Sequence, residues 1–228
     1  MKRLFFFSML LLVALCATAK KIKVSVSPAT AKIYVDGSYY GEGQALLNIP
    51  KKEGFVVVRV EDNGYVPIET RIFSTDTRSA ISFKLREDPS VEATTEYGNA
   101  NKYFTVRVNK DLYKVDDKGK VDAELAWKMI HAIILNYFDE IQTSDMASGY
   151  VQTAWVYKTF PEAEKAIRTR VSVRETSLGG DLSFQIKISS QESSMRGRRN
   201  ADNFKDSNRI LKDVAPIISE FQSRLGKL

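Results

Sequence analysis

The chain has 228 residues, of which 34 are Lys or Arg and 28 are Asp or Glu, so its formal net charge is +6. It contains one cysteine and one histidine, which excludes an internal disulfide, a His–His metal pair and a zinc site built from several cysteines. The mild positive charge is spread along the chain and does not predict nucleic-acid binding.

The first 19 residues have the pattern of a cleaved secretory signal peptide. Lys2 and Arg3 precede an apolar run over 4–15, and residues 17–19 form an A-x-A cleavage site. The run is shorter than the roughly 20 apolar residues that span a bilayer. We therefore expect an exported protein, in the periplasm or at the cell surface. Two alternatives stay open, namely an uncleaved anchor and a lipoprotein modified at Cys16, although Leu15 is larger than the residue that usually precedes a lipidated cysteine.

Residues 20–86 are predicted to form a small, mainly β module. Apolar residues at 22, 24 and 26 alternate with polar ones, as do those at 33 and 35, and this period indicates half-buried strands. Asp36–Gly37 predicts a tight turn, because glycine accepts a positive φ. Further strands are expected over 54–61, 68–73 and 80–85. No segment has a helical period, so we expect a β-sandwich or a β-barrel-like module.

This first block carries a spaced set of turn and strand residues, namely Ser27–Pro28, Ala31, the sequence IYVDG over 33–37, Gly41, Gly54 and Gly64–Tyr65. In these residues the block resembles the PEGA domain, a small β module of exported and surface proteins. It departs from the family pattern at Thr30, where a glycine is usual, and at Glu42–Gly43, where a small residue and a proline are usual. The resemblance implies an envelope-associated interaction domain without catalytic residues.

The remainder of the chain is predicted to be a polar linker over 87–102 and an α+β domain over 103–228. The order is β-α-β-β-β-α. The first helix is expected over 121–142 with Asp122 as its N-cap, and strands are expected over 103–108, 148–160, 166–176 and 182–189. A final helix is expected to bury apolar residues from Ile210 to Leu225, with Pro216 bending or breaking it. The prediction is a two-layer domain with an antiparallel sheet and both helices on one face.

The order of elements in this second domain is similar to that of the helix-grip domains in lipoproteins of the outer-membrane β-barrel assembly machinery. The Ala126–Trp127 pair that opens the helix and the sequence GYVQTAW over 149–155 add to the likeness. The resemblance implies a role in assembly through contacts with other envelope proteins.

A basic, aromatic sheet face is the main binding surface that the sequence predicts. Side chains alternate along a strand, so Arg168, Arg170 and Arg174 should point away from the apolar side. Lys187 should share their face, and the preceding strand should add Trp155 and Tyr157, or else Tyr150 and Gln152, depending on its register. Arginine beside aromatic residues is typical of interaction surfaces. A solvated outer face, made soluble by its charge, is the alternative.

Two further groups of residues are secondary candidates. Arg196, Arg198 and Arg199 lie in a polar loop over 193–205 and could make a peripheral contact with anionic lipid headgroups or glycan phosphates. Tyr34, Tyr39 and Tyr40 lie around the Asp36–Gly37 turn and could stack on sugars, although three tyrosines in a small β module are also ordinary strand formers.

The sequence offers no constellation that supports catalysis. His131, the one histidine, lies inside the predicted helix, and no pair of carboxylates has the spacing of a catalytic or metal site. We therefore predict no catalytic residue, no metal and no cofactor. The expected function is that of an exported, non-enzymatic envelope protein that binds an envelope protein partner; binding of a cell-wall or surface polysaccharide is the alternative.

Overall fold

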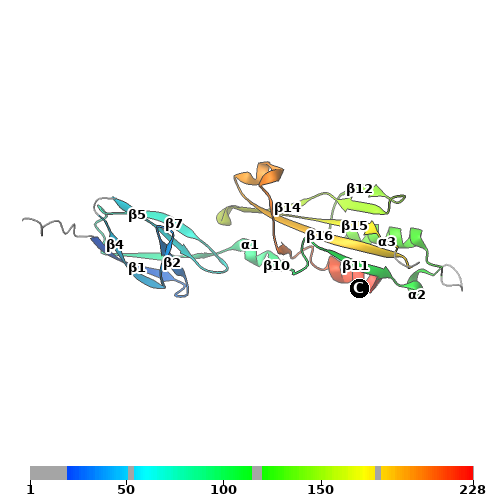
Figure 1. Cartoon of the computed structure of the whole chain (residues 1–228), viewed down its shortest axis with the longest axis horizontal. Coiled ribbons are helices and arrows are strands. Elements are labelled where there is room, and N and C mark those ends of the chain that lie inside the picture. The colour runs from blue at the N-terminus through cyan, green and yellow to red at the C-terminus, as the bar shows by residue number, and fades with distance from the viewer. Residues whose placement is uncertain (1–19, 51–53, 115–119, 178–180, 228) are drawn as a thin grey trace, which may run out of the picture. The chain divides into compact units, whose positions relative to one another are not determined.

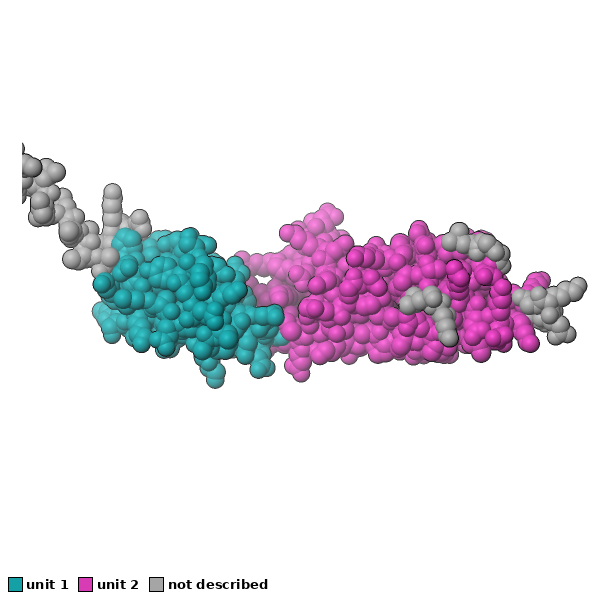
Figure 2. Space-filling model, turned by 60° about the horizontal axis from the view of Figure 1, so that its bottom comes forward, with its two compact units in different colours: residues 1–88 teal, residues 89–228 magenta. Residues whose placement is uncertain are grey.

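The computed structural model describes residues 20–50, 54–114, 120–177 and 181–227 (Figure 1). The predicted signal peptide, including Cys16, lies outside the described residues. The chain divides into two compact units, unit 1 over 1–88 and unit 2 over 89–228, which have different colours in Figure 2.

Unit 1 is a β-sandwich, as the sequence predicts. One sheet has the order β4-β1-β8 and the other β3-β2-β5-β7, while β6 and β9 form a separate pair. β1 pairs antiparallel with β4 and parallel with β8. The strands are β1 (Lys20–Ser27), β2 (Lys32–Val35), β3 (Ser38–Glu42), β4 (Gln44–Ile49), β5 (Phe55–Glu61), β6 (Tyr65–Val66), β7 (Ile68–Phe73), β8 (Ala80–Lys84) and β9 (Arg86–Glu87).

The alternating pattern of unit 1 explains its core. The apolar residues of β1 and β4 face those of β2, β5 and β7, and these side chains are almost fully buried between the two sheets. The two-residue turn between β2 and β3 has φ values of 46° at Asp36 and 80° at Gly37, as a tight hairpin requires. Asp36 Oδ1 also accepts a 2.8 Å hydrogen bond from the Val57 amide, which ties this turn to β5.

Unit 2 is a two-layer α+β domain. Its main sheet has the order β12-β13-β15-β16-β11-β19, with β14 beside β15 and β17 beside β16, and β10 pairs separately with β18. The strands are β10 (Thr94–Glu96), β11 (Tyr103–Val108), β12 (Ile141–Asp145), β13 (Tyr150–Thr153), β14 (Val156–Phe160), β15 (Lys165–Glu175), β16 (Ser183–Ser194), β17 (Lys205–Asp206), β18 (Arg209–Leu211) and β19 (Gly226–Lys227). The helices are α1 (Pro89–Glu92), α2 (Lys110–Tyr113), α3 (Ala123–Leu135), α4 (Ile217–Glu220) and the helical segments η1 (Pro161–Ala163), η2 (Gly197–Arg199), η3 (Ala201–Asn203) and η4 (Phe221–Leu225).

α3 and the consecutive segments α4 and η4 cover the same face of this sheet. Buried residues of α3, such as Ile130 and Ile134, share one core with Phe221 and Leu225 of η4 and with Val171 and the other inward residues of the sheet. Asp122 is the N-cap of α3, as predicted, because its side chain accepts a 2.9 Å hydrogen bond from the Leu125 amide. None of the helices in the described ranges combines the length and the apolar character that a bilayer crossing requires.

Segment 87–102, predicted as a linker, is instead ordered. β9 pairs with β6 in unit 1, whereas α1 and β10 belong to unit 2. Arg209 holds this part of unit 2 in place: its guanidinium donates to the carbonyls of Val91 and Thr94, both at 3.1 Å, and to Thr94 Oγ1 at 2.8 Å. The segment is therefore ordered by polar contacts. Such contacts produce no apolar period, so the sequence pattern did not predict them.

The helices differ from their predicted lengths. α3 ends at Leu135 rather than at residue 142, and residues 141–145 instead form β12. The predicted final helix is divided as well. Residues 209–211 pair with β10 as a strand, and the helix starts only after Pro216, which occupies the N-cap position. Proline has no amide hydrogen to donate, so it is tolerated at a helix start and not inside one.

Candidate functional site

The sheet face of unit 2 opposite α3 carries a cluster of cations and aromatic rings, which we call the arginine face. Alternation along β15 places its arginines on this side, because the intervening Ile167, Thr169, Val171 and Val173 are buried on the other side. The β15–β16 register puts Lys187 opposite Ser172, on the same side. The arginine face consists of the cations Arg168, Arg170, Arg174 and Lys187 and the rings Tyr103, Trp155, Tyr157 and Phe204.

A shift in strand register brings both predicted sets of residues to this face. The predicted strand over 148–160 is divided into β13 and β14, and its pairing with β15 moves by one residue between Gln152↔Ser172 and Val156↔Thr169. The extra residue inverts the alternation, as in a β-bulge. Gln152 and Tyr157, which have opposite parity in the sequence, therefore both contact arginines of the same face.

Arg168 is buried by its neighbours and is not accessible to a partner at the surface. Only 7% of its surface is exposed, and its guanidinium carbon lies 4.4 Å from the Trp155 ring centroid and 4.0 Å from that of Phe204. Its Nε and Nη2 donate to Gln191 Oε1 at 2.9 and 2.6 Å. These contacts fasten the chain before β17 to the sheet, so the predicted role of Arg168 as an open contact residue is corrected to a structural one.

Arg170 is the half-buried centre of the cluster. Its guanidinium carbon lies 4.3 Å from the Trp155 centroid, and Nη1 donates a 3.1 Å hydrogen bond to Gln152 Oε1. Its Nε is buried without a hydrogen-bond partner among the described residues. Burial lowers the pKa of Arg170 below its usual value, and the nearby Arg168 charge acts in the same direction. A guanidinium nevertheless stays charged at neutral pH, so this position holds an incompletely solvated cation.

Arg174 forms the exposed end of the cluster. Its guanidinium carbon lies 4.2 Å from the Tyr103 centroid, and Lys187 Nζ lies 5.7 Å from the same ring. Gln185 Oε1 accepts from Arg174 Nε at 2.9 Å and from Nη2 at 2.6 Å. The neutral amide and the aromatic ring fix the orientation of the guanidinium and leave its charge uncompensated.

The arginine face carries positive charge without acidic neighbours. Within the described part of the chain, no carboxylate lies within ion-pair distance of Arg168, Arg170, Arg174 or Lys187. Their hydrogen-bond acceptors are glutamine amides, a tyrosine hydroxyl and a backbone carbonyl. Oriented, unneutralised guanidinium groups suit the binding of carboxylate or phosphate.

Two of the rings on this face were missed by the sequence reasoning. Tyr103 lies at the start of β11, where alternation with the buried Val106 and Val108 could have placed it on the outer side. Phe204 lies in a polar loop, and its burial to 7% exposure depends on the fold of the chain before β17. A lone aromatic residue in a loop gives no period from which its contacts can be predicted.

The secondary candidates lie outside the arginine cluster. Arg196, Arg198 and Arg199 are exposed at η2, and Arg198 Nη1 donates to the Met195 carbonyl at 3.1 Å. Tyr39 and Tyr40 of β3 are 59% and 42% exposed. Tyr39 meets Tyr34 edge to face, with a ring separation of 5.8 Å.

One pair of side chains has geometry that the sequence reasoning did not foresee. His131 Nε2 lies 2.8 Å from Ser144 Oγ, and its Nδ1 lies 2.9 Å from the Trp127 carbonyl oxygen. If Nδ1 carries the proton, Ser144 donates to Nε2, as in an activated serine. The pair lies between α3 and the exposed strand β12. In the residues that the structure describes, no group of three or more His, Cys, Asp or Glu side chains could hold a metal ion.

The comparison with known families assigns unit 1. The family model of the PEGA domain matches residues 19–88, and the described residues of this range form the β-sandwich. No curated protein matches the chain. The match covers the residues on which the sequence resemblance rests, including the hairpin turn at 36–37. Unit 1 of this chain is therefore a PEGA domain.

Proposed function

We propose that this chain is an exported, non-enzymatic protein of the cell envelope that acts by binding another envelope protein through the arginine face. A PEGA domain is a module of extracellular and envelope proteins, and its presence is compatible with export. The order of elements in unit 2, similar to that of helix-grip domains in envelope assembly lipoproteins, supports an assembly role.

The observation that carries the proposal is the uncompensated charge of Arg170 and Arg174. Each guanidinium rests on an aromatic ring and is oriented by a glutamine amide, and neither has a carboxylate partner among the described residues. An isolated protein normally neutralises or fully solvates such groups. A partner that supplies carboxylates would complete their hydrogen bonding.

Pre-organisation favours binding at this face. Ordering a long side chain at an interface costs about 0.5–1.5 kcal/mol. Stacking on Trp155 and Tyr103 restricts these arginines before any partner arrives. Arginine and aromatic residues are also the types that dominate binding energy in protein interfaces. The partner surface should therefore be acidic, with its carboxylates spaced to meet neighbouring positions of one β-sheet.

The non-enzymatic part of the proposal rests on the surroundings of the one serine–histidine pair. Ser144 is exposed, and the His131 Nδ1 contacts a backbone carbonyl where a catalytic triad has a carboxylate. Hydrolysis also needs donors that stabilise an oxyanion close to the nucleophile. A binding role accounts for the arginine face without such chemistry.

Site-specific photo-crosslinking in the native host tests the proposal. A photoreactive phenylalanine at Tyr103 or Tyr157, whose rings are 41% and 53% exposed on the arginine face, should trap one defined envelope protein. The same probe at Leu112, a residue of α2 that is 57% exposed and does not belong to the arginine face, is the control. The trapped partner should display an acidic surface, and its binding should weaken with rising salt concentration.

Charge reversal then identifies the residues. Arg170→Glu with Arg174→Glu should abolish the crosslink and the binding of the purified partner, whereas Arg196→Glu with Arg198→Glu changes the charge equally at η2 and should leave both intact. Arg168 is excluded from this test, since reversing a buried charge would disturb the fold. Crosslinks only at the control position, or binding unaffected by reversal at Arg170 and Arg174, would contradict the proposal.

A further inference from the structure

A row of four side chains crosses the outer face of one sheet in unit 1. In the pairing register, Tyr34 of β2 lies opposite Tyr39 of β3 on one side and Arg59 of β5 on the other, and Arg59 lies opposite Glu69 of β7. The neighbouring residues Ile33 and Val58 are fully buried in the sandwich. Because side chains alternate along strands, the row lies on the face away from the core.

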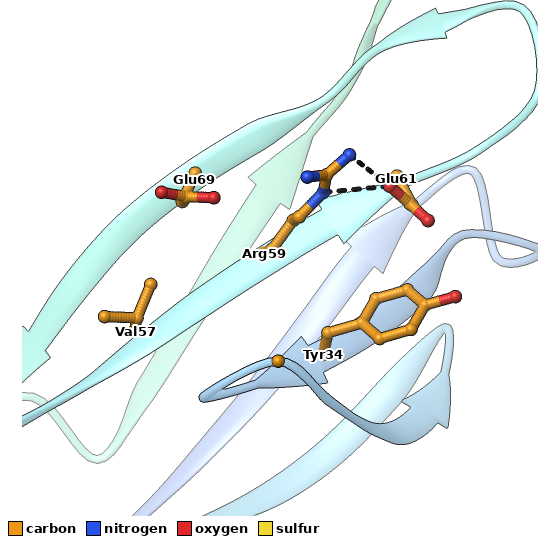
Figure 3. A pocket seen from close by; sticks show the side chains of 6 residues that line it. Tyr34, Val57, Arg59, Glu61 and Glu69 are labelled. Atoms are coloured by element: carbon orange, nitrogen blue, oxygen red, sulfur yellow. Dashed lines mark hydrogen bonds and ion pairs between the residues drawn. The ribbon is translucent and has the colours of Figure 1, made fainter.

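The row borders a hollow of about 420 Å³, within the size range of small-ligand sites. Figure 3 shows Arg59 and Glu61 on one strand, with Glu69 on a neighbouring strand and the Tyr34 ring on the other side of the arginine. The hollow is lined by Tyr34, Gly37, Val57, Arg59, Glu61 and Glu69.

The polar groups of this hollow combine donors with acceptors. Glu61 Oε2 accepts from Arg59 Nε at 2.9 Å and lies 2.7 Å from Arg59 Nη2, which fixes the guanidinium. Glu69 makes no ion pair or side-chain hydrogen bond with another described residue. Lys32 and Arg71 lie on the same outer face, opposite Glu61 and Val57 in the register, so charges of both signs surround the hollow. The unpaired Glu69 carboxylate disfavours an anionic ligand in the hollow itself.

We propose that this hollow binds a neutral oligosaccharide. A sugar hydroxyl both donates and accepts, so neighbouring hydroxyls can donate to Glu69 and Glu61 while accepting from the remaining N–H groups of Arg59. The Tyr34 ring, held by its edge-to-face contact with Tyr39, supplies an apolar surface for the C–H face of a sugar ring. The binding group is thus Tyr34, Arg59 and Glu69. Of the three tyrosines that the sequence suggests, Tyr34 lines the hollow, whereas Tyr39 and Tyr40 do not.

A second hollow argues for more than one sugar ring. It has a volume of about 340 Å³ and shares Glu61 with the first. Its lining includes Lys32, Asn63 and Tyr65, which again place polar groups beside an aromatic ring. A ligand that uses both hollows would extend past Glu61 on either side, as a linear oligosaccharide can.

Titration calorimetry on the full secreted chain tests this site. The probes are chitotetraose and cellotetraose as neutral oligosaccharides and tetragalacturonate as the anionic one. At least one neutral probe should bind, and tetragalacturonate should not. Tyr34→Ala and Glu69→Gln should each weaken binding about tenfold, while Tyr34→Phe should retain it because the ring remains.

Matched controls come from the same part of unit 1. Tyr40→Ala removes an exposed tyrosine, and Glu42→Gln an exposed carboxylate, that do not line the hollow, and both should leave affinity unchanged. Glu69 is exposed, so Glu69→Gln should fold. This variant therefore keeps the test decisive even if Tyr34→Ala fails to fold. The proposal is overturned if no neutral probe binds, if only the anionic probe binds, or if Glu69→Gln binds as tightly as the unaltered chain.

Discussion

The guanidinium carbon of Arg170 lies 4.3 Å from the centroid of the Trp155 ring, and the same ring contacts Arg168 at 4.4 Å. Two like charges therefore share one aromatic side chain. The electron-rich ring face offsets part of their repulsion, and Gln152 and Gln191 accept from their N–H groups. This arrangement both stabilises unit 2 and orients the arginine face.

Removing the shared ring should destabilise unit 2. We expect Trp155→Ala to lower the free energy of unfolding by about 1–3 kcal/mol, because two cation–π contacts and part of the apolar burial are lost together. Trp155→Phe should cost less, since a ring remains. Urea unfolding followed by circular dichroism measures both. Equal stability of Trp155→Ala and the unaltered chain would show that the ring does not hold the arginines.

The register shift between β13 and β14 depends on a buried side-chain hydrogen bond. Thr153 Oγ1, on a fully buried residue, accepts a 3.0 Å bond from the Val171 amide where the regular ladder is interrupted. Thr153→Val keeps the shape and removes the acceptor. The unpaired amide should cost about 1–3 kcal/mol in the free energy of unfolding.

Thr159 offers a matched control for this change. It is an exposed threonine of β14, so Thr159→Val should change stability by less than about 0.5 kcal/mol. Amide hydrogen exchange at Val171 should accelerate in Thr153→Val and stay unchanged in Thr159→Val. Unchanged exchange in both variants would mean that the threonine hydroxyl does not maintain the shift.

The contact between Tyr137 and Glu220 should make stability depend on pH at both extremes. Tyr137 donates a 2.7 Å hydrogen bond to Glu220 Oε1. This bond, more than the contacts from Arg224 and Asn136, holds the pKa of Glu220 below its ordinary 4.5. Burial and the Glu220 contact raise the pKa of Tyr137 from 10.0 to about 12.

The signs of the two shifts differ. A carboxyl whose pKa is lowered in the folded state stabilises the protein at pH values above its ordinary pKa. This contribution is lost as the pH falls below 4.5. A tyrosine with a raised pKa stabilises below its ordinary pKa, and this contribution is lost between pH 10 and about 12. Urea unfolding of Glu220→Gln should show a flatter acid dependence, and Tyr137→Phe a flatter alkaline one. Parallel profiles for variants and unaltered chain would contradict the linkage.

Alternation and helical spacing predicted the elements that bury a continuous apolar stripe. The residues of β1 and β15 and the N-cap Asp122 are examples, because each depends on local sequence alone. Prediction failed where polar contacts at long range decide the structure. Arg209 orders the expected linker from more than 110 residues away, with sequence separations of 115 and 118 to the groups it contacts.

The candidate site was predicted to a similar extent. Strand parity placed the arginines and Lys187 on one face, yet it could not show that Arg168 is enclosed, because Phe204 reaches it from a distant loop. In a regular strand, Tyr157 and Gln152 would point to opposite faces, so the sequence predicted only one of them on the arginine face. The extra residue between β13 and β14 places both on that face. The hollow in unit 1 is lined by residues of β2, β5 and β7 and by Gly37 of the turn after β2. The alternation within one strand does not show which strands pair with it, so the sequence could not predict this hollow.

Substitution of Gly226 tests how closely β19, the last strand, approaches β11. Gly226 has an extended backbone, with φ 163°, so it needs no special conformational freedom. An added Cβ would nevertheless overlap the carbonyl oxygen of Arg107 and lie 2.9 Å from the Asn109 amide nitrogen. We expect Gly226→Ala to separate the two strands and to lower the free energy of unfolding by about 1–3 kcal/mol. Gly98→Ala is the control, because nothing lies within 4 Å of its added Cβ, and it should be neutral to within about 0.5 kcal/mol. Thermal unfolding ranks the two variants. Faster amide exchange at Asn109, which donates to the Leu225 carbonyl at 2.9 Å, would locate the damage at this strand pair, whereas equal melting temperatures would show that β19 moves aside without cost.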